Sequence, residues 1–149
     1  MLATIKRILV PVDGSATSDK ALTAALELAR QTGASVRLFH SVELAYAAGL
    51  DLNGQAMLFL REAGEQILAK ALASAQSAGV PAESRLLDQA AERLGEAVAN
   101  AAKDWPADLI VVGTHGRHGL GRVLLGSGAE QIVRLAPVPV LVIRGESAA

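Results

Sequence analysis

Short apolar runs alternate with longer amphipathic segments along the whole chain, and this alternation is typical of strands that alternate with helices. The apolar runs are rich in Val, Ile and Leu and end in Gly, Pro, Asp or Ser, as strands that lead into turns do. They predict five strands, at residues 5–12, 35–42, 81–87, 108–112 and 138–143. Because these runs are nearly continuous in apolar residues, we expect both faces of a parallel sheet to be covered.

Four segments repeat apolar residues at every third or fourth position, which predicts amphipathic helices. The first is expected after a cap at Thr17 or Ser18 and before Gly33, where glycine permits a left-handed terminus. The other three are expected at about 56–77, 94–104 and 129–135. Residues 43–55 show no clear period and are expected to form a long surface loop. This order of elements predicts a single α/β domain, residues 1–149, built on a parallel sheet.

The composition excludes several classes of protein. Lys plus Arg number 14 and Asp plus Glu 15, so the net charge is −1, and such a domain has no field that would attract nucleic acid or an anionic membrane. There is no cysteine, which excludes disulfides and thiolate metal sites. No apolar run approaches the roughly 18 residues of a membrane span, and the first residues lack a signal-peptide pattern. We therefore expect a cytoplasmic protein without nucleic-acid or membrane partners.

Two segments with unusual chemistry follow the first and fourth predicted strands, at residues 11–15 and 113–128. In a parallel sheet, ligands bind beyond the carboxyl ends of the strands, where the strand order reverses. Glycines in the second segment allow a close backbone approach, and Gly126 and Ser127 lie where the next helix should begin, so its free amides could hold phosphate. Arg117 could screen phosphate charge. The residues alone leave a second reading open, in which the glycines only shape a long connection and the arginines are solvated.

The spacing of these glycines is more specific than their number. Gly113-x-x-Gly116, then nine residues, then Gly126-Ser127 resembles the nucleotide-binding signature of the ATP-binding branch of the universal stress protein family. The start Ile-Leu-Val-Pro-Val-Asp-Gly-Ser and the finish Pro-Val-Pro-Val-Leu-Val-Ile look like that family as well, so the resemblance covers essentially the whole chain. It implies a doubly wound, Rossmann-like sheet of the adenine nucleotide alpha hydrolase-like type. Its five parallel strands would run in the order 3-2-1-4-5, with helices on both faces.

The resemblance also implies a site for ATP, ADP or AMP. Asp13 would hydrogen-bond the ribose hydroxyls, because a carboxylate is an acceptor and a diol offers two donors. The other residues implied by the resemblance form two groups. One group surrounds the adenine and its border with the ribose, and the other surrounds the phosphates. On the adenine side they are Pro11, Val12, Ser41, Val112 and Gly113, and on the phosphate side Gly116, Gly126, Ser127 and Gly128, beside Arg117. Mg²⁺ would be held through phosphate oxygens and water, with no metal site built from protein side chains.

The family's last strand pairs across a two-fold axis, so the resemblance implies a homodimer through the strand from Val138 to Ile143. An apolar edge strand left bare would be an aggregation hazard, which is an independent reason to expect a partner strand there. The chain departs from the family at 87–92, where many relatives have a Gly-Asp-Pro-like turn, and at 46–55, which matches no family motif.

We therefore expect an ATP-binding, homodimeric regulator of the stress response that acts on an unidentified protein partner, with slow or no hydrolysis. Two alternatives stay open: an interaction module that binds no nucleotide, and a slow ATPase or phosphotransferase. The chain lacks the GxxxxGK[ST] motif of P-loop NTPases, and no general base is recognisable. His115 and His118 make a poor metal pair without a cysteine. His40 is expected to be packed or hydrogen-bonded rather than catalytic.

Overall fold

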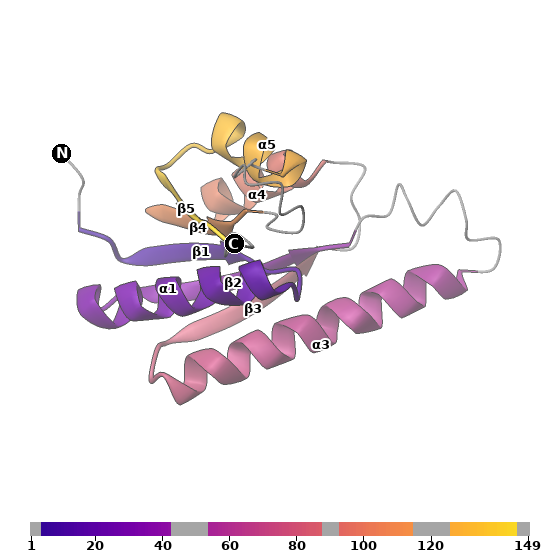
Figure 1. The fold of residues 1–149 in the computed structure, drawn as a ribbon, viewed down its shortest axis with the longest axis horizontal. Coiled ribbons are helices and arrows are strands. Elements are labelled where there is room, and N and C mark those ends of the chain that lie inside the picture. Colours follow the sequence, from indigo (N-terminus) through magenta and orange to yellow (C-terminus); the bar gives the residue numbers. More distant parts are fainter. Residues whose placement is uncertain (1–3, 43–53, 88–92, 115–125, 146–149) are drawn as a thin grey trace.

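The five apolar runs form one parallel sheet in the computed structural model, which describes residues 4–42, 54–87, 93–114 and 126–145 (Figure 1). The strands lie in the order β3-β2-β1-β4-β5, which confirms the expected doubly wound arrangement. Their bounds are β1 Arg7–Pro11, β2 Ser35–Ser41, β3 Ala82–Leu87, β4 Leu109–Gly113 and β5 Val140–Ile143. The edges of the sheet are therefore β3 and β5.

The four helices of the described residues cover the sheet in pairs (Figure 1). Helices α1 (Ala16–Thr32) and α3 (Gln55–Ser77) pack on one face, and α4 (Leu94–Asp104) and α5 (Ser127–Leu135) pack on the other. Right-handed crossovers explain this division. The connections through α1 and α3 move across the sheet in one direction, and those through α4 and α5 move in the opposite direction.

Neighbouring residues of β1 point to opposite faces of the sheet and so divide the core in two. Ile8 and Val10 pack with α1 and α3, whereas Leu9 packs with α4 and α5, and all three side chains are fully buried. The apolar stripe expected on the first helix is buried against the sheet as well. Both faces of the central strands are therefore covered, as the continuous apolar runs predicted.

The start of α1 differs from the expectation. The helix begins at Ala16 and its N-cap is Ser15, so the prediction of a cap at Thr17 or Ser18 is wrong. Ser15 Oγ accepts a hydrogen bond from the Ser18 amide at 3.1 Å, while Ser18 Oγ accepts one from the Asp13 amide at 3.1 Å. Several hydroxyls in this segment can cap a helix, and the turn that precedes Ser15 decides among them because it places Ser15 in an extended conformation.

Two strands begin two residues later than the sequence predicted. β1 begins at Arg7 rather than at residue 5, and β5 begins at Val140 rather than at residue 138. Pro137 and Pro139 have no N–H to donate to a neighbouring strand, which explains the late start of β5. Of the loop expected at 43–55, the structure describes only Gly54, which caps α3, and the first residue of that helix.

The strand order reverses between β1 and β4. β1 leads through α1 to β2 on one side, and β4 leads through α5 to β5 on the other, so the chain leaves these two neighbouring strands in opposite directions. A crevice forms at such a point, beyond the carboxyl ends of the strands. No helix among the described residues is long and apolar enough to span a bilayer.

Candidate functional site

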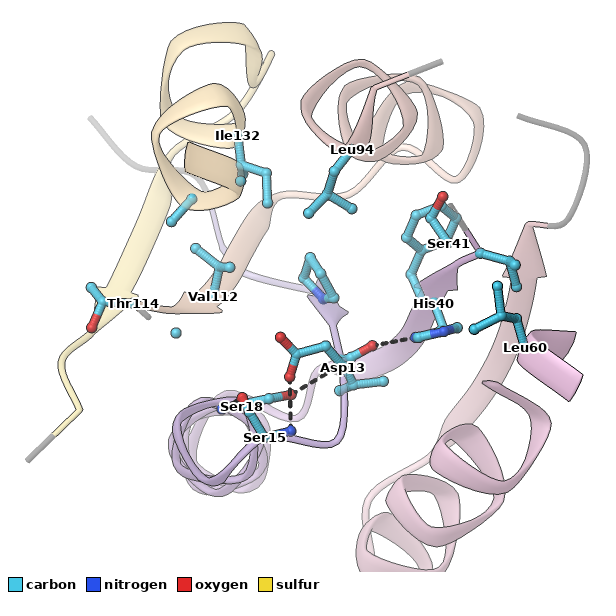
Figure 2. A pocket seen from close by; sticks show the side chains of 17 residues that line it. Asp13, Ser15, Ser18, His40, Ser41, Leu60, Leu94, Val112, Thr114 and Ile132 are labelled. Carbon is cyan, nitrogen blue, oxygen red and sulfur yellow. Dashed lines mark hydrogen bonds between the residues drawn. The ribbon is translucent and has the colours of Figure 1, made fainter. Parts of the chain in front are cut away.

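A cavity of about 340 Å³ opens at the carboxyl ends of β1, β2 and β4 (Figure 2). This volume lies within the range of small-molecule sites. Its lining comes from the ends of these three strands and from all four described helices. The lining residues are Pro11, Val12, Asp13, Ser15, Ser18, Phe39, His40, Ser41, Val42, Leu60, Leu94, Val112, Gly113, Thr114, Gly128, Ala129 and Ile132.

The turn between β1 and α1 holds Asp13 at the cavity (Figure 2). Asp13 Oδ1 accepts a hydrogen bond from the Ser15 amide at 2.8 Å, and the Asp13 amide donates to Ser18 Oγ at 3.1 Å. The second carboxylate oxygen accepts no hydrogen bond from another described residue. The nearby N-terminus of α1 favours negative charge at this position. The turn therefore offers a charged acceptor to a donor in the cavity, such as a hydroxyl group.

Apolar side chains form most of the remaining wall. Leu60 from α3, Leu94 from α4 and Ile132 from α5 reach the cavity from different sides, and Val112 contributes from the end of β4 (Figure 2). Six of the lining side chains are polar, and three of these, Asp13, Ser15 and Ser18, lie together at the start of α1, so the cavity suits a largely apolar group that carries hydroxyls at one side. A flat nucleobase joined to a sugar has this chemistry.

The N-terminus of α5 lies beside the cavity. Its N-cap is Gly126, which has no side chain to cap the helix, and the Glu130 amide donates to the Gly126 carbonyl at 2.9 Å. The amides before Glu130 have no partner within the helix, as in the first turn of any α-helix. Because Gly128 and Ala129 line the cavity, these amides and the helix dipole lie where they can bind an anion.

The structural reason for glycine differs among the described glycine positions of the site. A Cβ at Gly113 would lie 2.7 Å from the carbonyl oxygen of Thr17, and one at Gly128 would lie 2.9 Å from Leu94 Cδ2. The close approach of the α1 backbone therefore explains glycine at 113, whereas the contact at 128 is with the end of a flexible side chain, which can move. Gly126 has φ −59° and ψ 158°, a conformation open to most residues, so its backbone geometry does not require glycine.

Thr114 joins the cavity to the end of β5. Its side chain is buried and lines the cavity, its amide donates to the Ile143 carbonyl at 2.9 Å, and its Oγ1 accepts from the Gly145 amide at 3.2 Å. The hydroxyl thus extends the pairing of β4 and β5 beyond the last strand residue. The chain after β5 is fixed at the rim of the cavity.

The structure brings most of the residues expected at the site to one place, and their contacts with a nucleotide stay a prediction. Gly126 is the N-cap of α5 and is not part of the lining, and Ser127 is the first residue of that helix. Gly116 and Arg117 lie outside the described residues. The expected residues that line the cavity are Pro11, Val12, Asp13, Ser41, Val112, Gly113 and Gly128.

Sequence reasoning missed the apolar lining residues that come from helices. Leu60, Leu94 and Ile132 occupy ordinary apolar positions of amphipathic helices, and no local pattern distinguishes them from core residues. Ser15 could have been found, because serine is among the preferred N-cap residues and this serine follows the turn at Asp13 and Gly14. Among the described residues, no group of three His, Cys, Asp or Glu side chains could hold a metal ion. The pair His115 and His118 lies outside that part of the chain.

Solved structures with this fold include nucleotide complexes. A universal stress protein from Archaeoglobus fulgidus in complex with dAMP is 23% identical, with a TM-score of 0.72 over 95% of this chain and 99% of that chain. A universal stress protein in complex with cAMP is 24% identical, with a TM-score of 0.69 over 95% of this chain and 98% of that chain. At these identities the likeness shows the fold.

Sequence comparison identifies the family. The model of the universal stress protein family matches residues 4–144. A universal stress protein of Thermus aquaticus is 36% identical over 140 residues, which cover 93% of this chain and 98% of the relative. The structure of a family member from Burkholderia pseudomallei is 32% identical, with a TM-score of 0.72 over 95% of this chain and 97% of that chain. The chain therefore belongs to the universal stress protein family.

Proposed function

We propose that this chain binds an adenine nucleotide, ATP or else ADP or AMP, and acts as a nucleotide-dependent regulator of the stress response rather than as a dedicated enzyme. One observation carries the proposal: a charged acceptor, Asp13, and the N-terminus of α5 lie in the lining of the same apolar cavity. A nucleotide has the matching parts in one molecule, namely sugar hydroxyls, a flat base and an anion. The dAMP and cAMP complexes of two family members support adenine as the base.

The proposed contacts follow from this arrangement. Asp13 accepts hydrogen bonds from the ribose hydroxyls, and the base and its border with the sugar lie against Pro11, Val12, Ser41, Val112 and Gly113. The phosphates lie at the start of α5, where free amides and the helix dipole favour negative charge. The residues proposed to hold them are Gly126, Ser127 and Gly128, with Gly116 and Arg117. Mg²⁺ binds to the phosphate oxygens and to water.

The proposal includes a homodimer in which the last strand, from Val138 to Ile143, pairs with its copy. Leu141 on β5 is 40% exposed, and Val133 and Leu135 on the adjoining α5 are 44% and 43% exposed. Exposed apolar side chains that flank an apolar edge strand are a surface that a second copy can bury. Residues 1–149 form one domain in this proposal, which binds a protein partner in the cytoplasm according to its nucleotide state.

Hydrolysis is proposed to be slow or absent. The described lining residues from α5, where the phosphates are assigned, are Gly128, Ala129 and Ile132, and none of their side chains can accept a proton from an attacking water. Asp13 is assigned to the ribose hydroxyls instead.

The first experiment identifies the ligand. Freshly purified protein is denatured, and the released small molecules are identified by chromatography and mass spectrometry, followed by titration of the emptied protein with MgATP. We expect about one adenine nucleotide per chain. An empty protein that MgATP does not stabilise would overturn the proposal. The favoured function would then be the interaction module, a reading with which the packing role of Gly113 agrees.

A matched pair of variants locates the site. Asp13→Asn removes the charged acceptor from the cavity, and we expect the dissociation constant for ATP to rise about tenfold, because a hydrogen bond to a charged group contributes roughly 1.5–3 kcal/mol. Asp19→Asn is the control, since Asp19 lies nearby on α1 but does not line the cavity. Equal effects of the two substitutions would contradict the assignment of Asp13.

A further inference from the structure

His40 lies near the end of β2, where its ring lines the cavity and is half-buried (Figure 2). Its Nδ1 lies 2.7 Å from the carbonyl oxygen of Val12. A carbonyl only accepts hydrogen bonds, so Nδ1 carries the hydrogen and donates it. The expectation that His40 is hydrogen-bonded is thus confirmed, and its partner is the residue that precedes Asp13.

Val12 is fixed on both of its backbone groups by consecutive residues of β2. Its amide donates to the Phe39 carbonyl at 2.8 Å, and its carbonyl accepts from the ring of His40. β1 ends at Pro11, so these two bonds extend the contact between β1 and β2 by one residue. The backbone that leads into Asp13 is therefore held by one main-chain bond and by one side-chain bond, and the second depends on His40.

Gly64 of α3 holds the ring from its other side. A Cβ at Gly64 would lie 2.7 Å from His40 Cδ2 and 3.1 Å from His40 Nε2. It would also lie 2.9 Å from the end of the Leu86 side chain. Glycine destabilises the interior of a helix relative to alanine, so a buried glycine in the middle of α3 needs a packing reason. The approach of α3 to the imidazole is that reason.

We propose that His40 is a positioning residue for the nucleotide site. Held between Gly64 and the Val12 carbonyl, its imidazole fixes the backbone before Asp13 and thereby the place of the Asp13 carboxylate. The inference rests on the proposed function, since it assigns to Asp13 the hydroxyls of the nucleotide sugar. It adds that α3, through a glycine that does not line the cavity, determines how well these hydroxyls are recognised.

The test measures sugar recognition and not only binding. ATP and 2′,3′-dideoxyATP are titrated into the emptied protein with Mg²⁺, and the ratio of the two dissociation constants is compared between variants. We expect the wild-type protein to prefer ATP about tenfold, as for a hydrogen bond to a charged group. In His40→Ala we expect this ratio to fall below about threefold, while the affinity for dideoxyATP changes less than threefold. A merely structural role of His40 would weaken both ligands equally.

A second variant perturbs the His40 ring through a substitution on α3. Gly64→Ala places a methyl group where the imidazole lies, and we expect it to lower the ratio as His40→Ala does. In the double variant the methyl group enters the space that the imidazole has left, so its effect on the ratio should be no larger than that of His40→Ala alone. Gln66→Ala, on the side of α3 that faces α1, is the control and should leave the ratio unchanged.

Rescue by a conservative substitution completes the test. His40→Asn keeps a side-chain N–H at the position of Nδ1 for the Val12 carbonyl, and we expect it to restore most of the preference for ATP; it also serves if His40→Ala does not fold. A wild-type ratio in both His40→Ala and Gly64→Ala would overturn the inference and leave the proposed function standing. A wild-type protein that binds ATP and dideoxyATP equally would overturn it as well. No ATP binding at all would overturn the proposed function and this inference together.

Discussion

The two edges of the sheet present the same unpaired backbone groups in opposite chemical settings. On β3, the N–H and C=O groups of Ala82, Ser84 and Leu86 point away from β2, because the groups between them bond to that strand. On β5, the corresponding groups of Val140 and Val142 point away from β4. A free edge can pair with another chain, and proteins control this by the side chains that they place there.

β3 carries charge at its middle. Glu83, Ser84 and Arg85 are exposed, and Arg37 of β2 donates to Glu83 Oε1 from Nε at 3.0 Å and from Nη2 at 2.7 Å. The guanidinium of Arg37 also lies over the ring of Trp105, 4.8 Å from its centroid. Charges of this kind discourage a second strand from adding to the edge.

β5 has no charge within the strand and leaves Leu141 40% exposed. The adjoining helix α5 exposes Val133 and Leu135 as well. The difference teaches that, within one fold, charged side chains protect the β3 edge while the β5 edge stays available for association. The proposed homodimer uses the edge that lacks protection.

The largest expected effect comes from placing a charge on β5. Leu141→Lys puts an ammonium group where a second copy would pack, and we expect the dimer dissociation constant to rise by a factor of about 30 or more, since central interface side chains contribute 2 kcal/mol or more. Analytical ultracentrifugation should show the mass fall from two chains to one at micromolar concentration.

Leu58→Lys is the matched control for this substitution. Leu58 is 59% exposed, but it lies at the start of α3, which packs over β2 and β3 and not over β5. The mass should not change in this variant. If Leu141→Lys also leaves the mass at two chains, the dimer does not form through β5.

The sequence predicted the strands and the strand order because both depend on long, regular patterns. Continuous apolar runs identify buried parallel strands, and the family resemblance supplied the strand order, which the pairing of β1 with β2 and β4 confirms. The sequence predicted only the β5 side of the contrast between the two edges. The apolar character of β5 is visible in the sequence, whereas the protection of β3 depends on the pair of Arg37 and Glu83, which are 46 residues apart.

The residues of the candidate site, too, could be predicted from the sequence only in part. Asp13 and Gly113 directly follow the strands predicted at 5–12 and 108–112, so the rule that ligands bind beyond carboxyl ends finds them. The contact of Gly64 with His40 is non-local and arises from the packing of α3 on β2, which no sequence period encodes. Several hydroxyl side chains could cap α1, and the turn before Ser15, rather than intrinsic propensity, determines which one does. The sequence-based choice of cap was therefore wrong.

An intermediate effect is expected when β3 is made to resemble β5. The double variant Glu83→Val, Arg85→Val removes one charge of each sign, so the net charge stays the same while the edge becomes apolar. We expect new self-association, seen as a rise in light scattering and in sedimentation coefficient with protein concentration. Glu27→Val, Arg30→Val makes the same change on the exposed surface of α1, where the backbone is bonded within the helix, and should not associate. Association of both variants to the same degree would show that hydrophobicity, and not the free strand edge, is responsible.

The smallest effect is expected on the stability of the monomer. Glu83→Gln keeps an oxygen that accepts from Arg37 but removes the charge, and we expect a loss of about 0.5–1 kcal/mol in the free energy of unfolding by urea, the upper part of the range for exposed pairs. The Arg37 side chain is only 16% exposed and two of its nitrogens bond the same oxygen, which places this pair above a typical surface pair. Arg134→Gln removes the more exposed pair with Glu130, at 3.3 Å, and should cost about 0.3 kcal/mol. A loss of several kcal/mol in Glu83→Gln would mean that the charges on β3 hold the sheet together, and the contrast between a protected edge and a binding edge would then lose its basis.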